Sequence, residues 1–262
     1  MRRKDFLKLG ALFGGGVFSG ASFGGTGKKR VSEASIGETI SNAGLEGSMF
    51  DYADAPIEKV RVAMVGLGNR GSTLTEMLSW LVKNGHAEIV SICDVQPAFL
   101  DRAEASIAKF QRSVPRRIDG SSDENEWKKA CNPEEADLLL VATPWRWHAP
   151  MAMYAMEQGL HVATEVPIAY TVDQNLELLK TAERTKRHCI MLENCCYNGE
   201  ELFVLNMVKE GAFGELTHAE CAYIHDLRQL LIDEDYYHNR WRLQHHLERD
   251  GNLYTTHGLG PV

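Results

Sequence analysis

A glycine-rich turn between an apolar run and a helical pattern constrains the fold of this chain most strongly. The run at residues 60–65 leads into Gly66-Leu67-Gly68-Asn69-Arg70-Gly71, and a helical pattern follows over residues 71–83. A second apolar run, at residues 88–93, ends on Asp94. Strand, glycine turn, helix, second strand and terminal acid together are typical of a dinucleotide site. The sequence therefore predicts a nucleotide-binding α/β fold.

Each residue type in this turn has a physical reason. Gly66 makes the tight turn, Gly68 lets the backbone approach a pyrophosphate, and Gly71 lets the helix pack on the strand. The N-terminus of the helix then faces the negative charge of the ligand. We expect Asp94 to accept hydrogen bonds from an adenosine ribose and to repel a 2′-phosphate, which favours NAD over NADP. The alternative is a glycine turn without a ligand, which the surrounding pattern disfavours.

Apolar runs alternate with helical patterns from Val60 onward, which predicts a parallel sheet covered by helices on both faces, a doubly wound Rossmann-type fold. Ligands of such folds bind beyond the carboxyl ends of the strands. We expect strands at 60–65, 88–93, 137–142, 160–164 and 188–193, with a weaker one near 116–118, and helices at 71–83, 97–111, 124–131, 147–158 and 172–186.

The last part of the chain has a different pattern. A helix near residues 200–210 precedes an alternating stretch at 214–223, which we interpret as the first strand of a second, open-faced α+β domain. We place the nucleotide domain at 59–195 and part of a substrate domain at 196–262. One strand cannot bury a sheet face alone, because three or more are normally needed. The sequence thus leads us to expect an incomplete chain.

The N-terminal residues indicate export. Residues 1–30 carry seven Lys/Arg and one acid, and the glycine-rich stretch at 9–25 is a poor membrane-spanning helix. This segment is similar to a twin-arginine signal, although the pair in register with Phe6-Leu7-Lys8 is Arg3-Lys4. Residues 31–58 are polar and are interpreted as a linker or arm. We expect a periplasmic protein, or a cytoplasmic one if the signal is not used.

The charge of the chain restricts its partners. The net charge is −8, of which residues 1–30 contribute +6, so the remainder carries −14. That acidic body argues against nucleic acid or an anionic membrane as the main partner and favours a small molecule or glycan. The sequence leaves homo-oligomers open. The six cysteines do not predict a disulfide framework, and Cys195-Cys196 lacks metal-ligand spacing, so zinc is not expected. We expect Cys93, Cys131, Cys189 and Cys221 to act as small core residues.

The order of glycine turn, terminal Asp, Thr-Pro-x-x-x-His at 143–148 and Glu-x-Pro at 165–167 resembles the Gfo/Idh/MocA oxidoreductase superfamily. That resemblance implies a nucleotide domain followed by an open-faced sheet domain for a sugar-like substrate. Two departures remove the usual acid–base residues. Val166 stands where the family has a catalytic Lys, and Thr255 and Leu259 stand where a later motif has Asp and His.

The departures match one branch, glycoside hydrolase family 109, the NAD-dependent α-N-acetylgalactosaminidases. The resemblance runs from about Met49 to Val262, and Thr255 stands where Pro is expected. The later motifs are more specific than the glycine turn. The matching segments are Met49-Phe50-Asp51-Tyr52-Ala53, Trp145-Arg146-Trp147-His148, Glu165-Val166-Pro167, Met191-Leu192-Glu193-Asn194, Tyr223-Ile224-His225-Asp226-Leu227-Arg228, Trp241-Arg242, His245-His246 and Gly251-Asn252-Leu253-Tyr254-Thr255-Thr256-His257-Gly258. The resemblance implies NAD contacts from Asn69, Arg70, Asp94, Trp145, Arg146, Trp147, His148, Glu165, Val166 and Asn194, and sugar contacts from Tyr223, Arg242, Tyr254, Thr255, Thr256 and His257.

The resemblance also implies a reaction in which the sugar is oxidised, loses its C2 proton and its leaving group, takes up water and is reduced again. We expect Tyr223 and His257 to transfer the protons, with His225 as a helper, because His titrates near neutral pH. We assign no role to His245-His246, which fit a solvated helix face; Tyr170 and Tyr197 stay open as proton carriers. Tightly bound NAD⁺ suits an exported enzyme, which has no free NAD pool to draw on. The alternatives are an exported sugar oxidoreductase and an inactive nucleotide-binding fragment.

Overall fold

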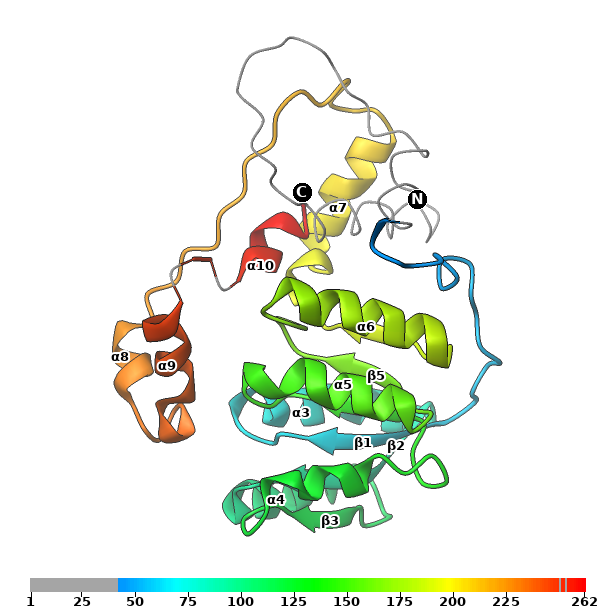
Figure 1. Ribbon diagram of the computed structural model, residues 1–262, viewed down its shortest axis with the longest axis vertical. Helices are drawn as coiled ribbons and strands as arrows, with labels where there is room; N and C mark the ends of the chain where they lie inside the picture. Colours follow the sequence, from blue (N-terminus) through cyan, green and yellow to red (C-terminus); the bar gives the residue numbers. More distant parts are fainter. Residues whose placement is uncertain (1–41, 250, 253) are drawn as a thin grey trace.

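The chain forms a six-stranded, wholly parallel sheet with strand order β3-β2-β1-β4-β5-β6 (Figure 1). This computed structural model describes residues 42–249, 251, 252 and 254–262. The predicted signal at 1–30 and the first part of the arm lie outside these residues. The order confirms the predicted doubly wound fold, whose strand order reverses between β1 and β4. The strands are β1 (Val60–Val65), β2 (Ala87–Asp94), β3 (Arg116–Asp119), β4 (Leu138–Val141), β5 (His161–Thr164) and β6 (Cys189–Met191).

Helices cover both faces of this sheet, as the alternating pattern predicts. Local signals set where they begin: Pro97 opens α4 at a position where its missing N–H costs nothing, and the Thr171 side chain caps α6 by accepting from Gln174 N. One face carries α3 (Asn69–Lys83) and α4 (Pro97–Ile107); the other carries the 3-10 helix η1 (Glu124–Ala130), α5 (His148–Glu157) and α6 (Val172–Thr185).

Two buried clusters, one on each face, hold the layers together. Successive strand residues point to opposite faces, so Val62 and Met64 of β1 join the cluster under α3 and α4, whereas Ala63 and Val65 join the cluster under α5 and α6. Because β1 is buried on both sides, it reads as a continuous apolar run rather than an alternating one.

Most cysteine predictions hold. Cys93 and Cys131 belong to the core, and burial raises the pKa of each thiol to about 12, which keeps both protonated. Cys189 packs against the same cluster. Cys221 is only partly buried and lies outside both clusters, so its assignment to the core is wrong.

All the regular elements described after β6 are helices. The strand predicted at 214–223 is therefore wrong. Residues 214–227 have no regular structure, and none of the described strands pairs with their backbone. The predicted helix at 200–210 is confirmed as α7. The elements of this part are η3 (Asn194–Cys196), α7 (Gly199–Lys209), α8 (Arg228–Ile232), η4 (His238–Arg240), α9 (Trp241–Glu248) and α10 (Thr255–Leu259). In Figure 1, α8 and α9 form a compact unit beside the sheet, and α10 lies near α7.

The described part of the arm, residues 42–58, docks on the nucleotide domain. The backbone amides of Glu46 and Ser48 donate to the Glu183 carboxylate at 2.8 and 3.0 Å, and Asp54 pairs with Arg187 at 2.7 Å. This part of the arm is therefore a packed segment rather than a free linker. None of the described helices combines the length and apolar character that crossing a bilayer requires.

Candidate cofactor and substrate site

A cavity of about 1040 Å³ lies where the carboxyl ends of β1, β2 and β4 meet the segment from α8 to α10. The fold places it at the reversal of strand order, where ligands of such sheets bind. It brings together all the predicted site residues except Gly71, Thr255 and Thr256. Those in its wall are Gly66, Gly68, Asn69, Arg70, Asp94, Trp145, Arg146, Trp147, His148, Glu165, Val166, Asn194, Tyr223, Arg242, Tyr254 and His257.

The glycine turn fits a pyrophosphate. Gly66 has φ +87°, and a Cβ there would lie 2.6 Å from the backbone of Ala142; a Cβ on Gly71 would lie 2.0 Å from the Gly66 carbonyl oxygen. These two glycines are thus required by the turn itself. A Cβ on Gly68 would meet only the Phe99 side chain, at 3.7 Å. The open space beside Gly68, at the start of α3, is where a phosphate can approach backbone amides.

Asp94 ties the turn to the end of β2. Its Oδ2 accepts from Leu67 N at 2.6 Å and its Oδ1 from Gln96 N at 2.8 Å. Burial raises the pKa of this carboxyl, while the two backbone donors act against that rise. Each oxygen keeps a further lone pair for a ribose hydroxyl. Asp94 therefore holds the turn in addition to facing the cavity.

The ends of β4 and β5 are fixed around Glu165 and His148. Arg70 pairs with Glu165 at 2.6 Å, which connects the start of α3 to the end of β5. His148 is buried, and its two ring nitrogens lie 2.8 Å from the Pro167 carbonyl and 2.7 Å from the Thr143 carbonyl. Burial lowers the pKa of His148, and hydrogen bonds to the two carbonyls act against that fall, because a neutral ring can donate to only one of them. Its side chain joins two loops of the cavity wall.

Trp145 joins the nucleotide domain to α9. Its buried ring lies 5.3 Å from Trp241 and 5.1 Å from His245, so the expectation of a solvated face at His245 is wrong. The Arg242 guanidinium lies over three aromatic rings, those of Trp145, Tyr237 and Tyr254, at 5.2, 5.3 and 4.7 Å. No carboxylate among the described residues forms a salt bridge with Arg242, so its charge is free to meet ligand oxygens.

The two predicted proton carriers are in contact. The Tyr223 and His257 rings lie 4.8 Å apart, and the Tyr223 hydroxyl is 2.9 Å from His225 Nδ1, which supports His225 as a neighbour able to exchange a proton. Tyr254 stacks on His257 at 5.0 Å, and burial raises its pKa above the usual 10. Of the two tyrosines left open, Tyr170 packs on His245, and Tyr197 is largely exposed outside the cavity wall.

Glu193 is a residue of this site to which the sequence analysis assigns no role. Its Oε1 lies 2.7 Å from His257 Nδ1; Glu193 is buried, and only 9% of the His257 side chain is exposed. The Glu-Asn pair at the end of the predicted last strand was a usable signal, but only Asn194 was given a role. Tyr236 and His238 were missed too: Tyr236 O accepts from Asn69, and His238 contacts Gln96. Their contacts arise from a loop packing against a distant turn, which local pattern does not encode.

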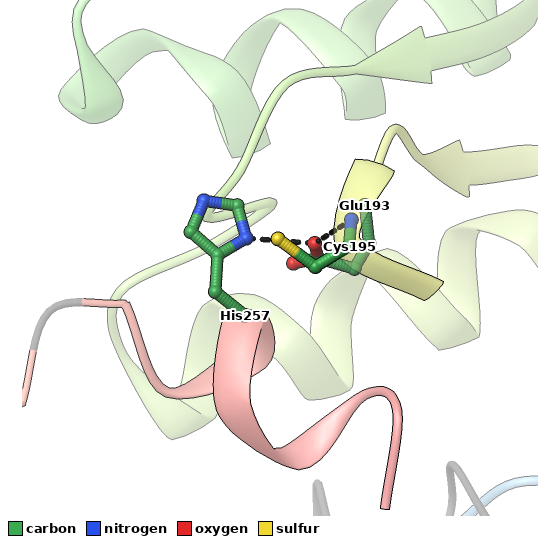
Figure 2. Close-up of side chains that lie close together, drawn as sticks. All are labelled: Glu193, Cys195 and His257. Atoms are coloured by element: carbon green, nitrogen blue, oxygen red, sulfur yellow. Dashed lines mark hydrogen bonds and ion pairs between the residues drawn. The ribbon is translucent and has the colours of Figure 1, made fainter. Parts of the chain in front are cut away.

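Glu193, Cys195 and His257 also form a group with metal-ligand chemistry, with ligand atoms within 4.8 Å of one another (Figure 2). Glu193 and His257 are, however, at hydrogen-bond distance. Two ligands on a tetrahedral zinc would stand about 3.3 Å apart, given metal–ligand distances of about 2.0–2.1 Å. The observed 2.7 Å between Glu193 Oε1 and His257 Nδ1 fits a hydrogen bond instead.

Two family models match this chain, and the boundary between them lies just after β6, the last strand of the sheet. Residues 60–193 match the model described as oxidoreductase family, NAD-binding Rossmann fold. Residues 197–262 match the model described as glycosyl hydrolase 109, C-terminal domain. The expected oxidoreductase family is confirmed for this chain, with NAD as the cofactor of its first domain. The C-terminal part matches the expected glycosyl hydrolase 109 domain.

Curated relatives carry the names of the same glycosyl hydrolase family or of its activity. An alpha-N-acetylgalactosaminidase of Shewanella oneidensis is 38% identical over the whole chain, which covers 54% of that protein. One of Bacteroides fragilis is 43% identical over 82% of the chain and 50% of its own length. A glycosyl hydrolase family 109 protein of Solibacter usitatus is 44% identical over 89% of the chain and 53% of its own length. The chain spans about half the length of these relatives.

Solved structures share the fold. The WlbA dehydrogenase of Bordetella pertussis, in complex with NADH and UDP-GlcNAcA, matches with a TM-score of 0.52 at 23% identity over 62% of this chain and 44% of its own. The scyllo-inositol dehydrogenase of Lactobacillus casei, with bound NAD(H) and scyllo-inositol, matches with a TM-score of 0.52 at 17% identity over 60% of this chain and 43% of its own.

Proposed function

Because the chain belongs to the oxidoreductase family with an NAD-binding Rossmann fold, we propose that it carries the cofactor site and part of the sugar site of an NAD-dependent glycosidase. The substrate class is a glycan with a terminal α-linked N-acetylgalactosamine. The observation that carries the proposal is one cavity that joins the glycine turn to Tyr223 and His257. The names of the Shewanella and Bacteroides relatives support the choice of sugar.

The groups around this cavity favour proton transfer over paired-carboxylate hydrolysis. Most glycosidases use two acids flanking the bond, and NAD-dependent ones are exceptions. Here the position of the family's catalytic Lys is held by Val166, which is buried and has no proton to give. The tyrosine and histidine rings of Tyr223, His225 and His257 lie together instead. They supply both a base and an acid within reach of one ligand.

The residues take the following parts in the proposed reaction. Gly68 and the start of α3 hold the pyrophosphate, and Asp94 holds the adenosine ribose. Bound NAD⁺ would supply a hydride acceptor that is restored within the same turnover. His257 removes the C2 proton of the oxidised sugar, and Tyr223 passes a proton toward the departing oxygen. Arg242 holds sugar oxygens and stabilises the negative charge that proton removal creates.

A chromogenic α-N-acetylgalactosaminide tests this function on the 262-residue protein. We expect release of the chromogen with no net change at the NADH absorbance, because the cofactor ends each turnover as it began. Release that requires a second, carbonyl-bearing sugar would favour the exported sugar oxidoreductase instead. Protein that binds NAD⁺ but cleaves nothing would support the reading as an inactive nucleotide-binding fragment.

Export belongs to the same proposal. The basic, glycine-rich residues 1–30 direct the folded, NAD-loaded protein to the periplasm through the twin-arginine route. A redox-neutral turnover suits that compartment, because it consumes no free NAD. A reporter fused behind residues 1–30 should reach the periplasm in cells with an intact twin-arginine translocase and stay inside cells that lack it.

A further inference from the structure

Glu193 and His257 form a buried pair brought together from distant parts of the sequence. His257 lies on α10, and Glu193 lies just beyond β6, 64 positions earlier. Glu193 Oε1 and His257 Nδ1 are 2.7 Å apart, and the two side chains are 7% and 9% exposed. Figure 2 shows the imidazole with Nδ1 turned to the carboxylate and its other nitrogen turned away from it.

The carboxylate of Glu193 has little freedom to move. Its Oε1 also accepts from Cys195 N at 2.9 Å, which caps the 3-10 helix η3. The backbone one residue earlier is fixed to the sheet, since Leu192 N donates to Thr164 O at 2.8 Å. Rigid attachment to a strand end is what a group needs to orient a partner side chain.

Burying the Glu193 carboxylate costs free energy, because one of its oxygens has no hydrogen-bond partner in the described part of the fold. Oε2 of Glu193 is buried and makes no hydrogen bond among the described residues. A buried acceptor without a partner typically costs about 1–3 kcal/mol, and more when it is charged. A group kept in that state is a candidate for a function in the site.

The pair determines which nitrogen of His257 faces the ligand. A carboxylate only accepts hydrogen bonds, so the proton of the neutral imidazole sits on Nδ1. The lone pair of Nε2 is then available in the cavity wall that His257 helps to form. Contacts of the ring with Tyr223 and Tyr254 fix its plane. When Nε2 takes up a proton, the buried carboxylate stabilises the resulting cation.

We propose that Glu193 is a positioning residue that holds His257 in the Nδ1–H tautomer, with Nε2 directed at the substrate. This role rests on the function proposed above, because it assumes that His257 accepts a proton there. The role also gives a reason for the buried Glu193 carboxylate after β6, which does not belong to the glycine turn.

The test compares Glu193→Gln with wild type. Gln keeps the shape but lacks the charge, and its amide can donate to the imidazole and favour the wrong tautomer. We expect kcat to fall at least about 100-fold, as at other carboxylate–histidine pairs, while KM and bound NAD⁺ stay near wild type. The same substitution at exposed Glu200, in the first turn of α7, serves as the matched control and should leave kcat unchanged.

A proton NMR signal provides the second readout. The Nδ1 proton of a histidine bonded to a carboxylate resonates far downfield. We expect such a signal in wild type, and its loss in both Glu193→Gln and His257→Gln. A kcat within threefold of wild type in Glu193→Gln, or a downfield signal that survives the substitution, would overturn the proposed role. EDTA treatment that abolishes wild-type activity would overturn it too, in favour of a metal bound by Glu193, Cys195 and His257.

The two readouts separate this role from the proposed function. If wild-type protein cleaves no α-N-acetylgalactosaminide, the proposed function fails by itself. The NMR signal then still decides whether Glu193 sets the tautomer of His257, because it requires no turnover.

Discussion

At the scale of single residues, the nucleotide turn shows which glycines serve the fold and which serves the ligand. Gly66 and Gly71 lie against backbone atoms that a Cβ would strike, whereas Gly68 faces open space next to the start of α3. The sequence motif alone treats the three alike. Their surroundings predict different consequences for the same substitution.

Gly71→Ala and Gly68→Ala should therefore differ. A Cβ on residue 71 would lie 2.0 Å from Gly66 O, so we expect a loss of about 2–3 kcal/mol in the free energy of unfolding together with a loss of NAD⁺ binding. Gly68→Ala should keep its stability and lose NAD⁺ affinity, because the methyl group occupies the space of the pyrophosphate. Urea unfolding and NAD⁺ titration measure both effects, with Gly199→Ala as a control in open space. Equal stability of the two variants would contradict this distinction.

At the scale of elements, the spacing of apolar residues predicts the strands and helices of the sheet domain. All six strands and the helices between them lie near their expected positions, because the central strands β1, β4 and β5 are largely buried and apolar. The edge strand β3 buries only Ile118, which is why its sequence signal is the weakest. The stretch at 214–223 has the alternation of a strand, but none of the described strands pairs with it, and alternation does not reveal whether a pairing strand exists. The Glu193–His257 contact was missed for a related reason, since it joins elements far apart in sequence.

His148 makes an element-scale prediction, because its buried ring lies between the loop after β4 and the loop after β5. Burial holds its pKa below the ordinary 6.5, so below pH 6.5 the unfolded chain takes up a proton that the folded chain resists. Stability contributed by the neutral ring is present above that pH and is lost as the pH falls toward the folded-state pKa. The slope from one such group is at most about 1.4 kcal/mol per pH unit.

Urea unfolding between about pH 7.5 and 5.5 measures this slope. His148→Gln should lose less stability than wild type over that range, whatever its stability at the higher pH. Identical slopes for His148→Gln and wild type would show that His148 does not titrate on unfolding.

At the scale of the whole molecule, two parts of the chain complete one site. The sheet supplies the glycine turn, Asp94 and Glu165, and the segment after β6 supplies Tyr223, Arg242 and His257. Trp145 fastens the two parts through its packing against Trp241 and under Arg242. The family match at 60–193 and the second match at 197–262 fall on these same parts. The nucleotide half was predictable from one motif, whereas the sugar half depended on a resemblance.

The central claim is that His257 and Tyr223 remove and return the C2 proton of a sugar beside a dinucleotide. Turnover of an α-N-acetylgalactosaminide in heavy water, followed by mass spectrometry and NMR of the released N-acetylgalactosamine, tests it most directly. We predict one deuterium at C2 of the product and none there in recovered, uncleaved substrate incubated without protein. Product that keeps its original hydrogen at C2 would contradict the account.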